Sequence, residues 1–163
     1  MDSSRQAALD GIIAGLGHDF SGEIRTGGDY LPVVIDGPTA YVSGQVPRVG
    51  TVVVVTGAAG SAVTLQDAQR AAVICTVRAL LLLRQSLGSL ERIRRVLRVG
   101  VFVQSAPQFS QQSEVADAAS GLLRQVLGDA GAHTRTSVGV LQLPKNATVE
   151  IEMTVSLEAG DER

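Results

Sequence analysis

Three stretches of the chain repeat apolar residues every three or four positions, the spacing that places side chains on one face of a helix. The first covers residues 3–15 and is followed by Gly17, a residue suited to end a helix. The second covers residues 64–86, with Thr64 as its expected N-cap. The third covers residues 111–127, where the apolar stripe is the most regular. The sequence therefore predicts three helices.

Six shorter runs are rich in apolar and β-branched residues and predict strands at 30–35, 39–43, 51–56, 96–103, 134–141 and 149–157. The first two runs flank the turn pair Asp36-Gly37, so we expect them to form a hairpin. The run TVVVVT at 51–56 is apolar without alternation, which predicts a strand buried on both faces. The order of elements predicts an α+β or α/β sheet with helices on one face, in a single domain spanning residues 1–163.

The last predicted strand, 149–157, alternates strictly between apolar and polar residues. Its apolar positions begin with Val149 and Ile151, and its polar positions begin with Glu150 and Glu152. Successive side chains of a strand point to opposite faces, so one face packs under the helices and the other is polar. The polar face either meets water or lines a cleft or a subunit contact, and both interpretations stay open at this point.

Arg135 lies near the start of the strand predicted at 134–141. If the last two strands formed a simple hairpin turning near residues 144–146, Arg135 would lie opposite Thr154. The offset from there to Glu150 is roughly 13 Å, more than two side chains comfortably bridge. If Arg135 and Glu150 cooperate, we therefore expect either that the strands are not hairpin neighbours or that a second subunit completes the site.

The composition is that of a compact globular protein, with 45% hydrophobic and 18% charged residues in a chain of 163. The net charge of -2 and the aromatic fraction of 3% argue against a nucleic-acid partner. We interpret the one basic run, residues 92–98, as a solvated strand entrance. The N-terminus shows no apolar signal region, and the longest strongly apolar run, 79–83, is far shorter than a membrane span of about 20 residues. We expect a soluble cytoplasmic protein without a membrane partner.

Three segments resemble the YjgF/RidA family of imine deaminases that act on reactive intermediates: YVSGQVP at 41–47, GVFVQSAPQF at 100–109 and RTSVGVLQLPKNATVEIE at 135–152. The most specific is the last, which reads R-x-S-V-x-V-x-x-L-P-K followed by V-E-I-E. The resemblance covers residues 28–157, and residues 1–27 form a helical extension like that of a longer subgroup. It implies a chorismate mutase-like fold, with a mixed sheet, two long helices on one face and an extra N-terminal helix. It also implies a homotrimer with clefts between subunits.

The resemblance further implies a role for each residue of a candidate site. Arg135 would hold the substrate carboxylate through its bidentate guanidinium. Glu150 would position the attacking water, and Tyr30 would close one wall of the cleft from the neighbouring subunit. Ser43 and Gly44 would supply polar contacts to the substrate. The reaction implied is hydrolysis of a 2-imino or enamino acid to a 2-keto acid and ammonia, and it requires no metal or organic cofactor.

Ser137 stands where active family members often carry a cysteine, and we assign it to substrate binding. His133 is either a proton donor at the cleft or a structural histidine. Where family members often carry an asparagine on the last long helix, this chain has Ala118, with Asp117 adjacent. A carboxylate-binding trimer without turnover is the second hypothesis for this chain, and an RNA-directed protein is a weaker third.

Overall fold

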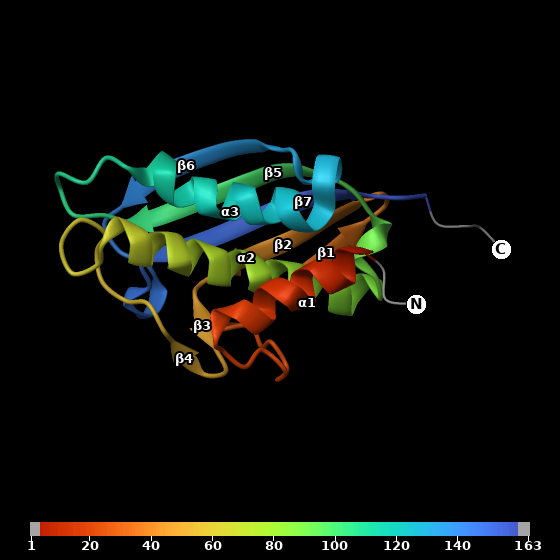
Figure 1. Ribbon diagram of the computed structural model, residues 1–163, viewed down its shortest axis with the longest axis horizontal. Helices are drawn as coiled ribbons and strands as arrows, with labels where there is room; N and C mark the ends of the chain where they lie inside the picture. Colours follow the sequence, from red (N-terminus) through yellow and green to blue (C-terminus); the bar gives the residue numbers. More distant parts are fainter. Residues whose placement is uncertain (1–3, 160–163) are drawn as a thin grey trace.

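The computed structural model describes residues 4–159, which fold into one large mixed sheet with helices on one face (Figure 1). The sheet order is β1-β2-β7-β5-β6, and every neighbouring pair is antiparallel except β5 and β6. The strand bounds are Val33–Asp36 for β1, Thr39–Gln45 for β2, Ile93–Gln104 for β5, Thr134–Val140 for β6 and Val149–Leu157 for β7. The α+β fold expected from the sequence is confirmed.

Two long helices, α2 (Leu65–Leu87) and α3 (Gln112–Leu127), cover one face of this sheet. The apolar positions of β7 are buried beneath them, and Val149 and Ile151 are both fully inaccessible to solvent. Burial of such apolar surface is the main favourable contribution to folding. Because side chains alternate along a strand, the polar positions of β7, including Glu150, point to the face that the helices leave open.

The ends of α2 follow the signals in its sequence. Thr64 Oγ1 accepts a hydrogen bond from the backbone N–H of Asp67 at 3.1 Å. Gly88 ends the helix with φ at 79°, a left-handed conformation that costs glycine little. The helix predicted over residues 64–86 is therefore confirmed together with its N-cap.

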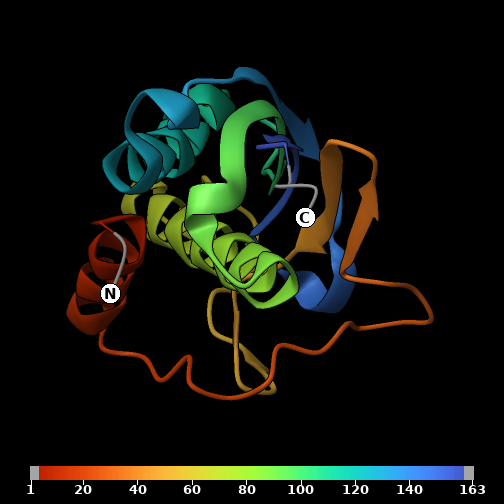
Figure 2. The same cartoon turned by 90° about the vertical axis from the view of Figure 1, so that its right-hand side faces the viewer.

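The N-terminal helix α1, Ser4–Leu16, packs outside the helix layer and away from the sheet (Figure 2). Leu9 is fully buried there, and Asp10 accepts a hydrogen bond from Arg84 Nη1 at 2.8 Å. After α1, residues 17–32 contain no helix or strand and run along the bottom of the Figure 2 view to β1. The N-terminal extension therefore brings this linker, rather than its helix, to the open side of the sheet.

The prediction of a buried strand at residues 51–56 is wrong. Only Val52–Val53 form a strand there, β4, which pairs with β3 (Arg48–Val49) in a separate two-stranded ribbon. The side chain of Val52 is 60% exposed. Beyond β4, the run meets the segment before β7 only through isolated contacts, such as the hydrogen bond from the Thr148 N–H to the Val55 carbonyl oxygen at 3.3 Å and the bridge between Thr56 and Ala147.

The last two strands do not form a hairpin, because β5 lies between β6 and β7. Arg135 on β6 pairs with Val99 of β5, whereas Glu150 on β7 pairs with Phe102. Paired residues share a face, and positions 99 and 102 of one strand point to opposite faces. The side chains of Arg135 and Glu150 therefore lie on opposite faces of the sheet. Of the two alternatives that the sequence left open, the strands are indeed not hairpin neighbours, but this arrangement does not bring Arg135 and Glu150 together within one chain.

Candidate active site

A pocket of about 220 Å³ opens where β2 and β7 meet the linker that follows α1. Three residues expected in the site, Tyr30, Gly44 and Glu150, line it together. The other lining residues are Arg25, Thr26, Gly27, Gln45, Val46, Arg48, Arg78, Pro144 and Lys145. A single chain therefore gathers the linker, the end of β2 and the start of β7 around one cavity.

Gly44 leaves room for the side chain of Glu150. The pairing of β2 with β7 shifts register between Val42 and Gln45, so Ser43 and Gly44 form an irregular, bulged segment. A Cβ atom at position 44 would collide with the Glu150 carboxylate. Only glycine lets the carboxylate lie directly against β2, and this spatial requirement is one that the sequence resemblance alone did not indicate.

The pKa of Glu150 is raised above its ordinary value. Burial is the main cause, because a low-dielectric environment disfavours the charged carboxylate. The negative charge of Glu152, two residues along on the same face of β7, raises the pKa further. A carboxyl group with a raised pKa exchanges its proton closer to neutral pH, which suits a general acid or base.

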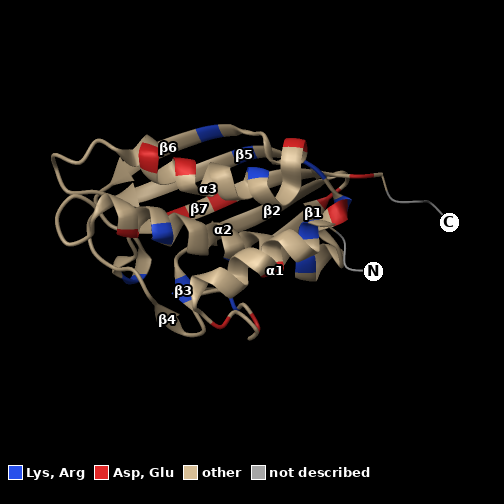
Figure 3. Cartoon of the chain, in the orientation of Figure 1, with Lys and Arg blue, Asp and Glu red and all other residues tan. Residues whose placement is uncertain are grey.

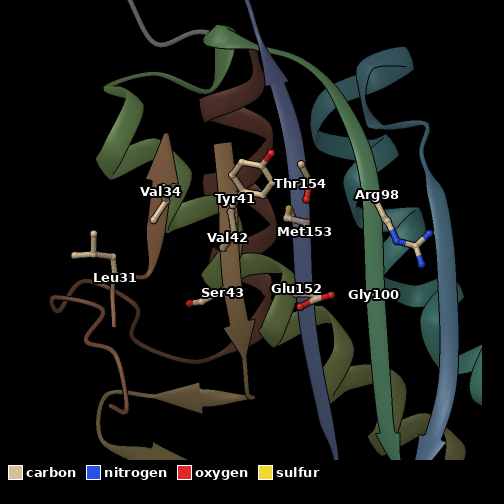
Figure 4. Close-up of a pocket in the computed structure, with 10 residues that line it drawn as sticks. All are labelled: Leu31, Val34, Tyr41, Val42, Ser43, Arg98, Gly100, Glu152, Met153 and Thr154. Carbon is tan, nitrogen blue, oxygen red and sulfur yellow. The ribbon is translucent and has the colours of Figure 1, made fainter. Parts of the chain in front are cut away.

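Ser43 lines a second hollow, of about 380 Å³, on the open face of the sheet (Figure 4). Glu152 lies in the same hollow, at the β7 side. Ser43 Oγ accepts a hydrogen bond from Gln45 Nε2 at 3.3 Å. Although Ser43 and Gly44 are adjacent in the sequence, the structure places them at different cavities, and only Gly44 lines the pocket of Glu150.

The side chain of Arg135 on β6 contacts Asp117 of α3. Figure 3 shows acidic positions on α3 next to β6. Its Nη1 donates to Asp117 Oδ1 at 2.8 Å and to Ser120 Oγ at 3.0 Å. Its Nη2 donates to Ser113 Oγ at 2.9 Å. These contacts fix the guanidinium near the edge of the sheet, and Asp117 balances its charge. Ala118, noted in the sequence beside Asp117, is not the contact residue.

His133 and Ser137 lie on the Arg135 side of the sheet and do not line the pocket of Glu150. The His133 ring contacts Ser120 Oγ through Nε2 at 2.9 Å and the Gly131 carbonyl oxygen through Nδ1 at 2.6 Å. Ser137 follows Arg135 by two positions on β6, so both side chains point to the same face. The predicted site residues thus form separate groups in one chain, on opposite sides of the sheet.

Within residues 4–159, no cluster of three or more His, Cys, Asp or Glu side chains is arranged to hold a metal ion. No helix in this part of the chain combines the length and apolar character that crossing a membrane requires. The titratable groups that line the pocket are a carboxyl group, guanidinium groups, an amine and the phenol of Tyr30.

Residues 12–156 match the model of the family described as "YjgF/chorismate mutase-like, putative endoribonuclease". The chain belongs to the YjgF family. The match spans nearly the whole described fold and confirms the resemblance carried by the motif at 135–152. Membership in the YjgF family supports a role in binding or processing small molecules.

The chain is similar to other proteins over most of their length. TCP17 of Trypanosoma cruzi is 39% identical over 130 residues, which are 79% of this chain and 81% of TCP17. The crystal structure of Atu1372 from Agrobacterium tumefaciens, a protein of unknown function, is 38% identical with a TM-score of 0.85, covering 95% of this chain and 96% of that one. A Shewanella oneidensis structure described as a "putative endoribonuclease" is 25% identical with a TM-score of 0.86, covering 95% and 100%.

Reasoning from the YjgF motifs missed the cationic part of the pocket. Arg48, Arg78 and Lys145 line it, and Arg78 is only 5% exposed. The available signal was an arginine inside the apolar run AVICTVRALLLL at residues 72–83, since arginine is rarely buried without a partner. Arg48 and Lys145 carried no comparable local signal, because only the tertiary structure brings them to this cavity.

Proposed function

We propose that this YjgF-family protein hydrolyses reactive 2-imino acids to 2-keto acids and ammonia, in clefts between the subunits of a homotrimer. The observation that carries the proposal is the Glu150 carboxyl, which has a raised pKa and lies with Tyr30 in a small pocket. A carboxyl group of this kind both accepts and returns a proton near neutral pH. Imine hydrolysis requires both transfers.

The two proton transfers follow in sequence. Ionised Glu150 accepts a proton from water while the water oxygen bonds to the carbon of the protonated imine and the C=N π pair moves to nitrogen. Glu150 then gives this proton to the nitrogen and the C–N bond breaks. The hydroxyl proton passes to the departing ammonia as the C=O bond forms. One water molecule is consumed, and one keto acid and one ammonium ion are released.

The carboxylate clamp would come from a second chain. Arg135 and Glu150 face opposite sides of the sheet in one chain, so they share a cleft only if the β6 edge of one subunit meets the pocket of another. Large apolar side chains are exposed on the open face and near this edge, with Tyr41 at 49% and Leu141 at 87%. An assembly would cover them, and exposed apolar patches often mark such contacts. These features support an assembly, and the family resemblance supports three subunits.

A coupled assay tests the proposal, with an amino-acid oxidase or a dehydratase generating the imine in the cuvette. We expect wild type to accelerate keto-acid release. The Glu150→Gln variant should lose about 10²–10⁴-fold in rate, the usual contribution of general acid–base catalysis. Arg135→Ala should raise KM by about tenfold to hundredfold, since it removes a charge-assisted hydrogen-bond donor. Arg124→Ala, at an exposed arginine of α3, is the matched control and should behave as wild type.

Absence of any acceleration by assembled wild-type protein, across small and bulky imino acids, would refute the deaminase activity. A carboxylate-binding trimer without turnover would then be the better account. Its support is in the sequence, where Ser137 and Ala118 stand in place of the cysteine and the asparagine that active family members often carry. That second function predicts carboxylates that raise the melting temperature while no keto acid is released faster.

A further inference from the structure

Arg78 is a buried arginine without an acidic partner. It lies in the middle of α2, where its Nε donates to Gln45 Oε1 at 3.3 Å and its Nη1 donates to the Arg48 carbonyl oxygen at 2.9 Å. Both acceptors are neutral. In the part of the chain that the structure describes, Nη2 has no hydrogen-bond partner. Since arginine is almost never buried unpaired, the arrangement leaves a positive charge for a ligand to balance.

Arg48 brings a second guanidinium to the same place. Its Nε is buried and has no hydrogen-bond partner within residues 4–159. A Cβ on Gly27 would lie 3.8 Å from Arg48 Nη1, so the guanidinium reaches the linker wall of the pocket. Burial lowers the pKa of Arg78, and the positive charge of Arg48 lowers it further. Two like charges are therefore held together, and a bound anion would relieve their repulsion.

Lys145 adds a third cation from the turn between β6 and β7, with its backbone at φ 58°. The acidic residue that lines the pocket is Glu150, and its raised pKa weakens it as a counter-ion. Among residues 4–159, no ion pair includes Arg48, Arg78 or Lys145; the arginines that do have acidic partners are Arg5, Arg25, Arg70, Arg84 and Arg135. The pocket therefore carries excess positive charge.

A purely structural role accounts for these residues less well. A neutral amide at position 78 could make hydrogen bonds to Gln45 and to a carbonyl oxygen without the free-energy cost of burying a charge. A structural role also leaves unexplained why Arg48 buries an Nε that has no hydrogen-bond acceptor within residues 4–159. The cations come from α2, β3 and the β6–β7 turn and converge on one small cavity, which is the arrangement of a ligand site.

We infer that Arg48, Arg78 and Lys145 form an anion subsite for a second carboxylate on the substrate. The inference rests on the proposed function: Arg135 of another subunit holds the carboxylate beside the imine carbon, and the three cations hold the carboxylate at the far end of the substrate. The pocket volume of about 220 Å³ suits a molecule of a few carbon atoms. The substrate class is therefore the imines of dicarboxylic amino acids.

Calorimetric titration with two keto acids tests the subsite without requiring turnover. The probes are 2-oxoglutarate, which has a distal carboxylate, and 2-oxobutanoate, which lacks one. We expect wild type to bind 2-oxoglutarate about tenfold to hundredfold more tightly, as one or two charged hydrogen bonds predict. Arg48→Met should lose most of this preference. Arg70→Met, at an exposed arginine of α2 paired with Asp67, is the matched control and should keep it.

Equal affinity of wild type for the two keto acids would overturn the subsite. So would an equal loss of preference in Arg48→Met and Arg70→Met, since that outcome reports only the change in net charge. Arg78→Met is the second variant, and circular dichroism shows whether it folds. If it folds, it too should lose the preference for 2-oxoglutarate, and if it does not fold, Arg48→Met decides.

The imine assay separates failure of the subsite from failure of the deaminase. Selective binding of 2-oxoglutarate by a wild-type protein that hydrolyses no imine would support the subsite and refute the enzyme. Hydrolysis of monocarboxylic imines without any preference for dicarboxylic ones, in either kcat/KM or keto-acid binding, would support the enzyme and overturn the subsite.

Discussion

Arg135 and Arg78 both place a guanidinium between a helix and the sheet, but their charges are balanced in different ways. Arg135 meets the carboxylate of Asp117 at 2.8 Å near the sheet edge. Arg78 is 5% exposed and reaches only neutral acceptors, on Gln45 and Arg48. A paired arginine near solvent costs little free energy, whereas an unpaired buried one is costly. The arginine outside the family motif is therefore the stronger structural sign of a missing anion.

Of the changes that separate the pocket from the Arg135 side, Gly44→Ala should have the largest effect on activity. It alters the pocket of Glu150 and leaves the contacts of Arg135 unchanged. The added methyl group would collide with the Glu150 carboxylate. The clash is with the far end of a flexible side chain, which can move aside at small cost in free energy, so we expect the free energy of unfolding to fall by less than about 1 kcal/mol. Moving the carboxylate from its place against β2 should abolish imine hydrolysis. Chemical denaturation and the coupled assay measure the two effects.

Gly121→Ala is the control, because it should change the free energy of unfolding in the opposite direction. Gly121 lies in α3 with open space around its Cβ position, so alanine should raise the free energy of unfolding by up to about 1 kcal/mol. A Gly44→Ala protein as active as wild type would show that the position of Glu150 against β2 does not matter for imine hydrolysis.

The Asp117→Asn change should have a smaller effect, on the Arg135 side alone. It removes the balancing carboxylate but keeps the size of the side chain and leaves the Arg135 contacts with Ser113 and Ser120 available. An exposed ion pair is worth about 0.2–1 kcal/mol, so we expect carboxylate affinity to rise by no more than about fivefold. Titration with 2-oxobutanoate measures this change. Asp129→Asn, at an exposed aspartate that forms no ion pair within residues 4–159, serves as control. Weaker carboxylate binding by Asp117→Asn would contradict the clamp.

The pH dependence of stability should show the smallest effect. Native Glu150 holds its proton more tightly than an unfolded glutamate, whose ordinary pKa is 4.5. Its stabilising contribution is therefore complete below pH 4.5 and is lost as pH rises through the raised native pKa. Relative to Glu150→Gln, wild type should lose less than about 1 kcal/mol over this range, because solvent still screens the group. Urea unfolding of both proteins across the range measures the difference, and a wild type that gains stability as pH rises would contradict the sign.

Local patterns predicted the elements whose signals are contained within a few residues. The strand Val149–Leu157 has the predicted bounds, because strict alternation needs no information from elsewhere in the chain. The cap at Thr64 is likewise a matter of neighbouring residues. The run at 51–56 does not form the predicted buried strand. Apolar character alone does not indicate whether a neighbouring strand of the main sheet is free to pair with the run.

The sequence by itself determined the three helices, the apolar face of β7 and membership in the YjgF family. Tertiary structure alone decided that β5 separates Arg135 from Glu150, and that Arg78 meets Arg48 in the pocket. The physical reason is that periodicity and capping arise between residues close in the chain, whereas strand order and the burial of a charge depend on contacts between distant segments.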